Sequence, residues 1–389
     1  MHATAAPFPG AAPVVIDPTG LETLIAFFRA RGDHVIGPRQ AGVGITWQPI
    51  EHAADLPRGW TATQAPGTYR LHHHETDGRL FAFGPTADSL KRLLHPPIDR
   101  LWVATREKGA LTFEPLERTV PRITVIGVRP CELEAIARLD RVFLHGPAVD
   151  PAYQARREAL TLVAVNCTEP GGTCFCASMG TGPRATALYD VALTELPDGR
   201  MTARAATPAG LAALAAVSAE PAQRPDLEQE EALITACVAR MGRRVHTEGL
   251  PERLAAAVEH PAWDTLAERC LACANCTMSC PTCFCHTIDD RTDLSGTRVE
   301  RERRWDTCFS AEFSYIHGGS IRPSVRARYR QWLTHKFSTW TDQFGTFGCV
   351  GCGRCVTWCP VGIDHTDALA QLTCRGGMSP EMQANPAQS

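Results

Sequence analysis

The sequence CLACANCTMSCP at residues 270–281 is repeated in pattern by CVGCGRCVTWCP at residues 349–360. In both runs two-residue gaps separate three cysteines, and a fourth cysteine follows three residues later, directly before a proline. A cubane [4Fe–4S] cluster needs four thiolates around one cage, and this spacing is the ligand run of proteins that hold two such clusters. The repeat therefore predicts two [4Fe–4S] clusters and indicates an electron-transfer function.

The fourth cysteine of each run is expected to bind the cluster of the other run. The first cluster is accordingly assigned Cys270, Cys273, Cys276 and Cys359, and the second is assigned Cys349, Cys352, Cys355 and Cys280. Structural zinc is the main alternative, because Cys-x2-Cys pairs also bind zinc. A zinc ion needs two pairs, however, whereas each run has three evenly spaced cysteines and a fourth before proline.

The chain has 389 residues, 17 cysteines and a net charge of −3, which does not imply a nucleic-acid partner. An odd number of cysteines in close groups favours metal binding in a reducing compartment over a disulfide framework. Residues 1–18 contain no Lys or Arg and no continuous apolar core, so they do not form a secretory signal. The apolar runs are too short to span a bilayer. A cytoplasmic protein without direct membrane insertion is expected.

An α/β domain with a partly parallel sheet is expected over residues 20–242. The segments ITVIGV at 123–128 and LTLVAV at 160–165 are continuous apolar runs, typical of strands that are buried on both faces. A helical pattern at 132–143 lies between them, and strand–helix–strand in this order predicts a parallel crossover unit. Residues 187–206 are expected to form a hairpin or two edge strands.

The long insert between Cys280 and Cys349 contains a helical pattern over Val325–Lys336. This favours a mainly helical, ferredoxin-like dicluster domain over the small two-hairpin form. Another amphipathic pattern, at residues 20–32, predicts a helix near the start of the α/β domain. The remaining predicted boundaries are a flexible N-terminus at 1–19, a polar linker at 242–250, the dicluster domain at 251–374 and a flexible tail at 375–389.

Four further cysteines form a candidate third metal site. Cys131 and Cys167 follow the two buried strands, and the carboxyl ends of parallel strands are where α/β sheets gather their ligand sites. Cys174 and Cys176 lie in a Gly-Gly loop that can fold back towards this edge. All four are expected to converge on zinc or on another iron–sulfur cluster. The alternative is a set of buried structural thiols.

A second small group consists of Cys283, Cys285 and Cys308, whose role the sequence leaves open. Shielding of the first cluster is favoured over another metal site, because too few ligands are identifiable for a closed site. Cys237 lies on an apolar helical face and is expected in the core. The chain contains no Gly-x-Gly-x-x-Gly fingerprint after a strand, no Walker loop and no nucleophile elbow. No catalytic residue is therefore assigned.

Four stretches carry a resemblance to a known family: GVRPCE at 127–132, NCTEPGGTCFC at 166–176, CPTCFC at 280–285 and RWDTC at 304–308. Together they resemble the dicluster iron–sulfur subunits (beta subunits) of cytoplasmic sulfhydrogenases, and the iron–sulfur electron-transfer subunit of anaerobic sulfite reductase is similar. The resemblance covers roughly residues 20–372. It implies an electron-transfer subunit between the catalytic nickel–iron hydrogenase part, with its large and small subunits, and a flavin/NAD(P)-binding subunit. Nickel and flavin are assigned to those partners.

Three other functions are weighed against this one. The nearest is the electron-transfer subunit of an anaerobic sulfite reductase. A function of another class makes the chain itself an iron–sulfur enzyme, with its site at the N-terminal cysteine group. A zinc-stabilised interaction module is the weakest. The sequence leaves open the hydrogenase or sulfite reductase setting, the stoichiometry of the complex and the cluster potentials, which depend on hydrogen bonds and burial.

Overall fold

The computed structural model describes residues 12–115 and 119–373. The predicted flexible tail at 375–389 and most of the predicted flexible N-terminus lie outside these residues. Within residues 12–19 the chain forms strand β1 (Val14–Ile16) and begins helix α1 (Pro18–Ala30). This helix starts two residues before the predicted one, because the Asp17 side chain caps it by accepting from the Gly20 amide at 2.8 Å.

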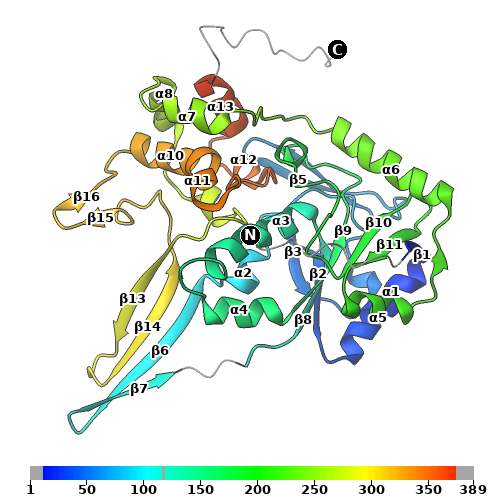
Figure 1. Ribbon diagram of the computed structural model, residues 1–389, viewed down its shortest axis with the longest axis horizontal. Helices are drawn as coiled ribbons and strands as arrows, with labels where there is room; N and C mark the ends of the chain where they lie inside the picture. Colours follow the sequence, from blue (N-terminus) through cyan, green and yellow to red (C-terminus); the bar gives the residue numbers. More distant parts are fainter. Residues whose placement is uncertain (1–11, 116–118, 374–389) are drawn as a thin grey trace.

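An eight-stranded mixed sheet forms the centre of the N-terminal α/β domain (Figure 1). The strand order is β12-β1-β11-β10-β9-β8-β2-β3, and the neighbours β10, β9, β8 and β2 are parallel. The other pairs are antiparallel. The remaining strands of the sheet are β2 (His34–Ala41), β3 (Gly44–Pro49), β8 (Ile123–Val128), β9 (Leu160–Val165), β10 (Val191–Glu195), β11 (Met201–Ala205) and β12 (Glu220–Pro221).

The predicted parallel crossover is confirmed. Strands β8 and β9 have the predicted bounds and pair in parallel, and helices α3 (Pro130–Phe143) and α4 (Pro151–Glu158) connect them. The hairpin expected at 187–206 is the antiparallel pair β10–β11. Both faces of the sheet are covered, since Val163 packs in a core with α1 whereas Leu162 packs in a core with α3. This arrangement explains why the central strands β8 and β9 are apolar except for Thr124 and Thr161.

Helices complete the α/β domain on both faces of this sheet. Alanine-rich α5 packs against β11 and against α1, while α6 lies along the other side of the same strand. A short hairpin, β4–β5, packs against the helical region through α12. The bounds are α2 (Lys91–Leu94), α5 (Pro208–Ala215), α6 (Arg224–Ala239), β4 (Trp60–Ala65) and β5 (Thr68–His73).

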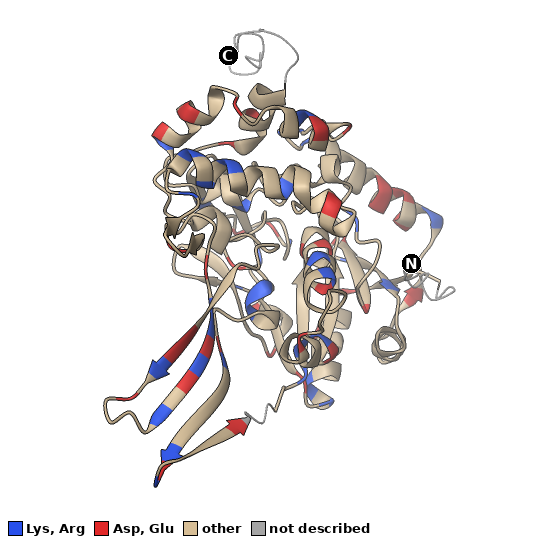
Figure 2. Cartoon of the chain, turned by 60° about the vertical axis from the view of Figure 1, so that its left-hand side comes forward, with Lys and Arg blue, Asp and Glu red and all other residues tan. Residues whose placement is uncertain are grey.

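A second sheet of four antiparallel strands projects from the body of the molecule (Figures 1 and 2). Its order is β13-β14-β6-β7, so the central pair joins strands about 200 residues apart in sequence. Charges of both signs alternate along its strand β14, as Figure 2 shows. No sequence pattern predicted this pairing. The strands are β6 (Ile98–Glu107), β7 (Ala110–Pro115), β13 (His286–Thr292) and β14 (Arg298–Trp305).

The C-terminal region that carries the two cysteine runs is helical. Its core is built around buried aromatic side chains, among them Trp263, Trp332 and Phe337. The helix predicted at 325–336 is α10, which continues as one π-helical turn at His335–Thr339. The helices are α7 (Leu250–Ala256), α8 (Ala262–Arg269), α9 (Asn275–Met278), α10 (Val325–Thr334), α11 (Trp340–Phe344), α12 (Arg354–Thr357) and α13 (His365–Thr373); a two-stranded ribbon, β15 (Tyr315–Ile316) with β16 (Gly319–Ser320), precedes α10.

Across residues 12–115 and 119–373, every helix is too short or too polar to cross a bilayer.

Candidate iron–sulfur centres

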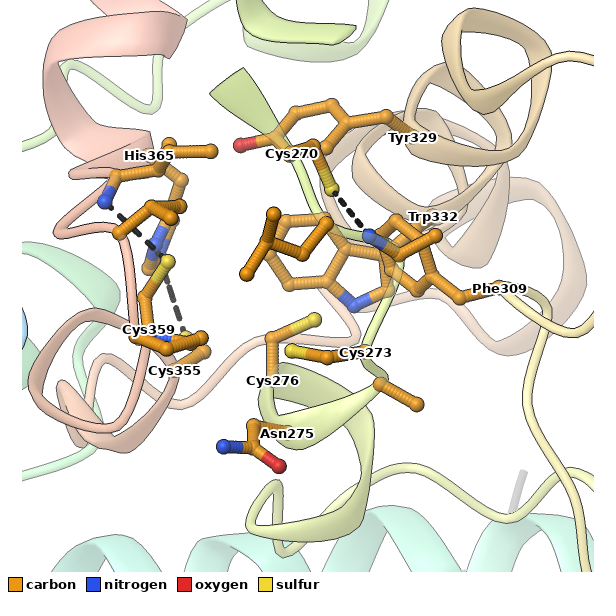
Figure 3. A pocket seen from close by; sticks show the side chains of 16 residues that line it. Cys270, Cys273, Asn275, Cys276, Phe309, Tyr329, Trp332, Cys355, Cys359 and His365 are labelled. Atoms are coloured by element: carbon orange, nitrogen blue, oxygen red, sulfur yellow. Dashed lines mark hydrogen bonds between the residues drawn. The ribbon is translucent and has the colours of Figure 1, made fainter. Parts of the chain in front are cut away.

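The first cysteine run faces the end of the second across a cavity of about 430 Å³ (Figure 3). The cavity is lined by Cys270, Cys273 and Cys276 from the loop around α9, and by Cys359 from the loop after α12. Aromatic side chains form much of the remaining wall: Phe309, Tyr329 and Trp332. Four thiols around one largely apolar space provide the donor set that a cubane cluster needs.

The second run lines a neighbouring cavity of about 360 Å³. Cys349, Cys352 and Cys355 meet Cys280, the last cysteine of the first run, at this cavity. The first cavity thus contains three cysteines of the first run with Cys355 and Cys359 of the second, and the second cavity contains three cysteines of the second run with Cys280 of the first. Three side chains line both cavities and form the wall between them: Trp332, Cys355 and His365.

Both cysteine runs adopt the same backbone conformation. In the first run Ala272 and Ala274 have φ angles of +50° and +68°, and at the matching positions of the second run Gly351 and Gly353 have +63° and +74°. The amide of the residue two beyond the first cysteine points at that cysteine's sulfur in both runs, at 3.4 Å for Ala272 and 3.3 Å for Gly351. The left-handed residues turn the chain so that three thiols face one point.

Burial explains why one run uses alanine and the other glycine. A Cβ atom on Gly351 would lie 2.6 Å from the backbone nitrogen of Cys176, and one on Gly353 would lie 2.4 Å from the carbonyl oxygen of Thr173. The N-terminal domain therefore covers the second run closely enough to exclude any side chain there. The first run lies at the surface, where Leu271 is 65% exposed, and has room for Ala272.

The four cysteines of the α/β domain also line one cavity. Cys131, Cys167, Cys174 and Cys176 surround a space of about 320 Å³ at the carboxyl ends of β8 and β9. Within residues 12–115 and 119–373, no three or more His, Cys, Asp or Glu side chains come close enough together to hold a single metal ion. The candidate third site consequently has no support as a preformed zinc site.

Comparisons with known proteins agree with this geometry. Residues 269–363 match the family model of the 4Fe-4S dicluster domain. The chain is 32% identical over 256 residues to Sulfhydrogenase 2 subunit beta of Pyrococcus furiosus, a match that covers 64% of this chain and 74% of that protein. This chain belongs to that family of dicluster iron–sulfur electron-transfer subunits. The family resemblance seen in the sequence motifs is confirmed. No solved structure matches this chain.

Buried cations that the sequence did not single out accompany the cysteines of this electron-transfer subunit. Lys336 is only 4% exposed, and its Nζ donates to Thr282 Oγ1 at 2.7 Å and to the Gly348 carbonyl at 3.3 Å. Burial opposes its charge, but the sulfurs of Cys280 and its neighbours raise its pKa above the ordinary value. Lys91 is also buried, and its Nζ lies 3.9 Å from the centre of the Trp305 ring. A lysine in a helical pattern is normally a surface residue, so nothing in the sequence signals that Lys91 and Lys336 are buried.

Most of the ligand candidates are thiols with raised pKa values, because burial disfavours the thiolate. It raises the pKa of Cys349 to about 12, and those of Cys276 and Cys355 well above the ordinary value. Cys280 differs, since a hydrogen bond from Cys283 and the charge of Lys336 lower its pKa well below the usual range. Metal ligation requires thiolates, so metal binding by this protein releases protons.

The remaining cysteine group, Cys283, Cys285 and Cys308, lies beside the two cavities of the cysteine runs without lining either. Cys283 donates a hydrogen bond to Cys280 of the second cavity. Cys308 is near enough to Cys276 of the first cavity for its charge to raise the pKa of Cys276. Burial raises the pKa of Cys285 and that of Cys308, the latter to about 12. Only Cys308 thus lies beside the first site, as the shielding prediction requires, whereas Cys283 lies beside the second; the shielding role itself stays a prediction.

Proposed function

We propose that this protein relays electrons between the catalytic part of a cytoplasmic nickel–iron sulfhydrogenase complex and a flavin/NAD(P)-binding subunit. Two [4Fe–4S] clusters in a ferredoxin-like arrangement are proposed to supply the one-electron oxidation and reduction. Their proposed ligands are the crossed sets, Cys270, Cys273, Cys276 with Cys359, and Cys349, Cys352, Cys355 with Cys280. The supporting observation is that each cavity contains the three closely spaced cysteines of one run together with the last cysteine of the other.

The wall between the two cavities supports a relay rather than two independent sites. Trp332, Cys355 and His365 line both, and His365 Nδ1 lies 3.6 Å from Cys355 Sγ. Nothing thicker than one layer of side chains therefore separates the two proposed clusters. The aromatic lining of the first cavity excludes water, and Lys336 offsets the negative charge that four thiolates bring to the second.

The two proposed cluster sites differ in solvent exposure, which suggests which of them exchanges electrons with a partner protein. Cys273 of the first run is exposed, whereas Cys352 of the second run is 7% exposed beneath the N-terminal domain. The first site is then the one that a partner protein reaches directly. The unpaired cysteines of the described residues fit a reducing compartment, which supports the cytoplasmic location.

The test is reduction of the clusters by NAD(P)H under anaerobic conditions, followed by visible absorption and EPR. The single chain is expected to stay oxidised with NAD(P)H alone and to become reduced when the flavin subunit is added. Reoxidation by the nickel–iron subunits with release of hydrogen supports the proposal. Sulfite-dependent reoxidation by a sirohaem subunit would instead assign the chain to an anaerobic sulfite reductase. Reduction of the chain by NAD(P)H without any partner overturns the relay.

A further inference from the structure

We infer that the N-terminal α/β domain of this protein binds a third iron–sulfur cluster, with Cys131, Cys167, Cys174 and Cys176 as ligands. Such a centre goes beyond the proposed two-cluster relay and does not depend on which partner subunits the chain serves. It also differs from the dicluster domain, whose family model matches residues 269–363 only.

The fold brings these cysteines together from three separate segments. Cys131 lies in the first turn of α3, directly after β8, and Cys167 follows β9. Because β8 and β9 are parallel neighbours, their carboxyl ends meet at one edge of the sheet. The loop after β9 then returns Cys174 and Cys176 to the same edge, where all four line one cavity.

The wall of this cavity keeps the space between the thiols open. A Cβ atom on Gly171 would lie 3.1 Å from Cys174 Sγ, and one on Gly182 would lie 3.2 Å from Cys176 Sγ. Much of the remaining wall consists of prolines and apolar side chains: Phe83, Pro85, Pro130, Pro170, Pro183 and Met241. Cys131 and Cys176 also pack with the fully buried Cys237 in one apolar cluster, but Cys237 does not line the cavity.

Positive charge lies at the edge of the cavity. An Arg129 guanidinium nitrogen is 3.8 Å from Cys167 Sγ, and the same side chain donates to the carbonyls of Phe81 and Phe83 at 2.8 and 2.9 Å. Arg129 is 4% exposed. A cluster with four thiolate ligands would place negative charge beside this guanidinium, in addition to the nearby Glu195 carboxylate.

The third cavity lies directly against the second. Cys174 Sγ donates to the Cys352 carbonyl at 3.8 Å, and the Phe175 amide donates to the Gly351 carbonyl at 2.8 Å. Cys131, Cys176 and Cys352 belong to one packed cluster of buried residues. The third cavity is thus adjacent to the second, which shares wall residues with the first.

Size favours a cluster over a zinc ion. Four sulfurs around zinc lie about 3.8 Å from one another, since each bond is about 2.3 Å long. The described residues contain no set that close, either in this cavity or in the two proposed [4Fe–4S] sites. The third cavity therefore resembles the two proposed [4Fe–4S] sites rather than a closed zinc site.

Iron, acid-labile sulfide and zinc in the full chain, prepared anaerobically, test the inference. Three cubane clusters require about 12 iron and about 12 sulfide per chain, whereas the two ferredoxin runs alone require about eight of each. A result near 12, with Mössbauer spectra of cubane clusters only, supports the third site. About eight iron, with or without one zinc, overturns it and leaves the two-cluster relay intact.

A matched pair of variants locates the additional iron. Cys174→Ala removes a thiol that is 5% exposed and lines the cavity, and Cys237→Ala removes a fully buried thiol that does not. Cys174→Ala is expected to lose about a third of the iron while the EPR signals of the other two clusters persist; Cys237→Ala is expected to keep all of it. Equal iron in both variants overturns the assignment. If Cys174→Ala does not fold, the wild-type count above still decides.

Discussion

Replacement of Gly351 by alanine tests the close contact between the N-terminal domain and the second cysteine run. Gly351 has a φ angle of +63°, and a Cβ atom there would lie 2.6 Å from the backbone nitrogen and 2.7 Å from the Cα atom of Cys176. Both atoms belong to the main chain, so no rotamer change relieves the overlap. The two loops, joined by the hydrogen bond from the Phe175 amide to the Gly351 carbonyl, must move apart.

Two contributions set the magnitude. A left-handed conformation costs a residue with a Cβ atom about 1–2 kcal/mol relative to glycine. Forcing extra volume into a packed interior adds about 1–3 kcal/mol. Gly351→Ala is therefore expected to lower the free energy of unfolding by about 2–5 kcal/mol. Gly42→Ala is the control, because Gly42 has a similar φ angle of +56° and nothing within 4 Å of its Cβ position. Gly42→Ala should lower the free energy of unfolding only by the backbone contribution, about 1–2 kcal/mol.

Urea unfolding of the anaerobic holoprotein, followed by circular dichroism, measures both variants through their midpoints. The reverse change, Ala272→Gly in the exposed first run, relieves a φ angle of +50° and should not destabilise the protein. If Gly351→Ala costs no more than Gly42→Ala, the tight packing of the two loops is wrong, and with it the shared wall between the second and third cavities.

Three further predictions concern the relay and its support. Lys336→Met removes a buried positive charge beside Cys280, so the potential of the second cluster should fall in an EPR redox titration while that of the first stays unchanged; equal shifts of both would contradict the placement of the charge. Cys280→Ser should perturb the cluster built on Cys349 and its run; loss of only the Cys270 cluster would refute the crossed ligation. Glu230 accepts from Arg204 at 2.8 Å, and although burial acts in the opposite sense, that bond and its charge lower the Glu230 pKa. Glu230→Gln should cost about 1–3 kcal/mol of unfolding free energy, less than a fully buried pair because the arginine is partly exposed. A carboxyl group with a lowered pKa contributes its full stability above its unfolded pKa of 4.5, so the cost should be equal at pH 7 and pH 5.5. A cost that has shrunk by pH 5.5 contradicts the lowered pKa.

The sequence alone determined the features that depend on local spacing. Three cysteines separated by two residues each can bind one cluster only if the chain turns tightly between them. This spacing is recognisable in the sequence, so the two ferredoxin runs could be identified without a structure. The segments at 123–128 and 160–165 predicted parallel strands correctly, because a run that is apolar on both faces, with only one threonine in each, is typical of a strand covered on both sides. Cys131 and Cys167 could be placed at one sheet edge for the same reason.

Only the tertiary structure decided what depends on contacts between distant segments. The sequence of neither β6 nor β14 indicates that the two strands pair, since backbone hydrogen bonds specify no partner and β14 is largely polar. In the sequence, Lys336 looks like an ordinary surface residue of a helix, and only the folded structure shows that it is buried beside Cys280. Gly351 and Ala272 occupy the same position in the same motif, and nothing local distinguishes them. The difference arises because the N-terminal domain packs against one run and leaves the other exposed.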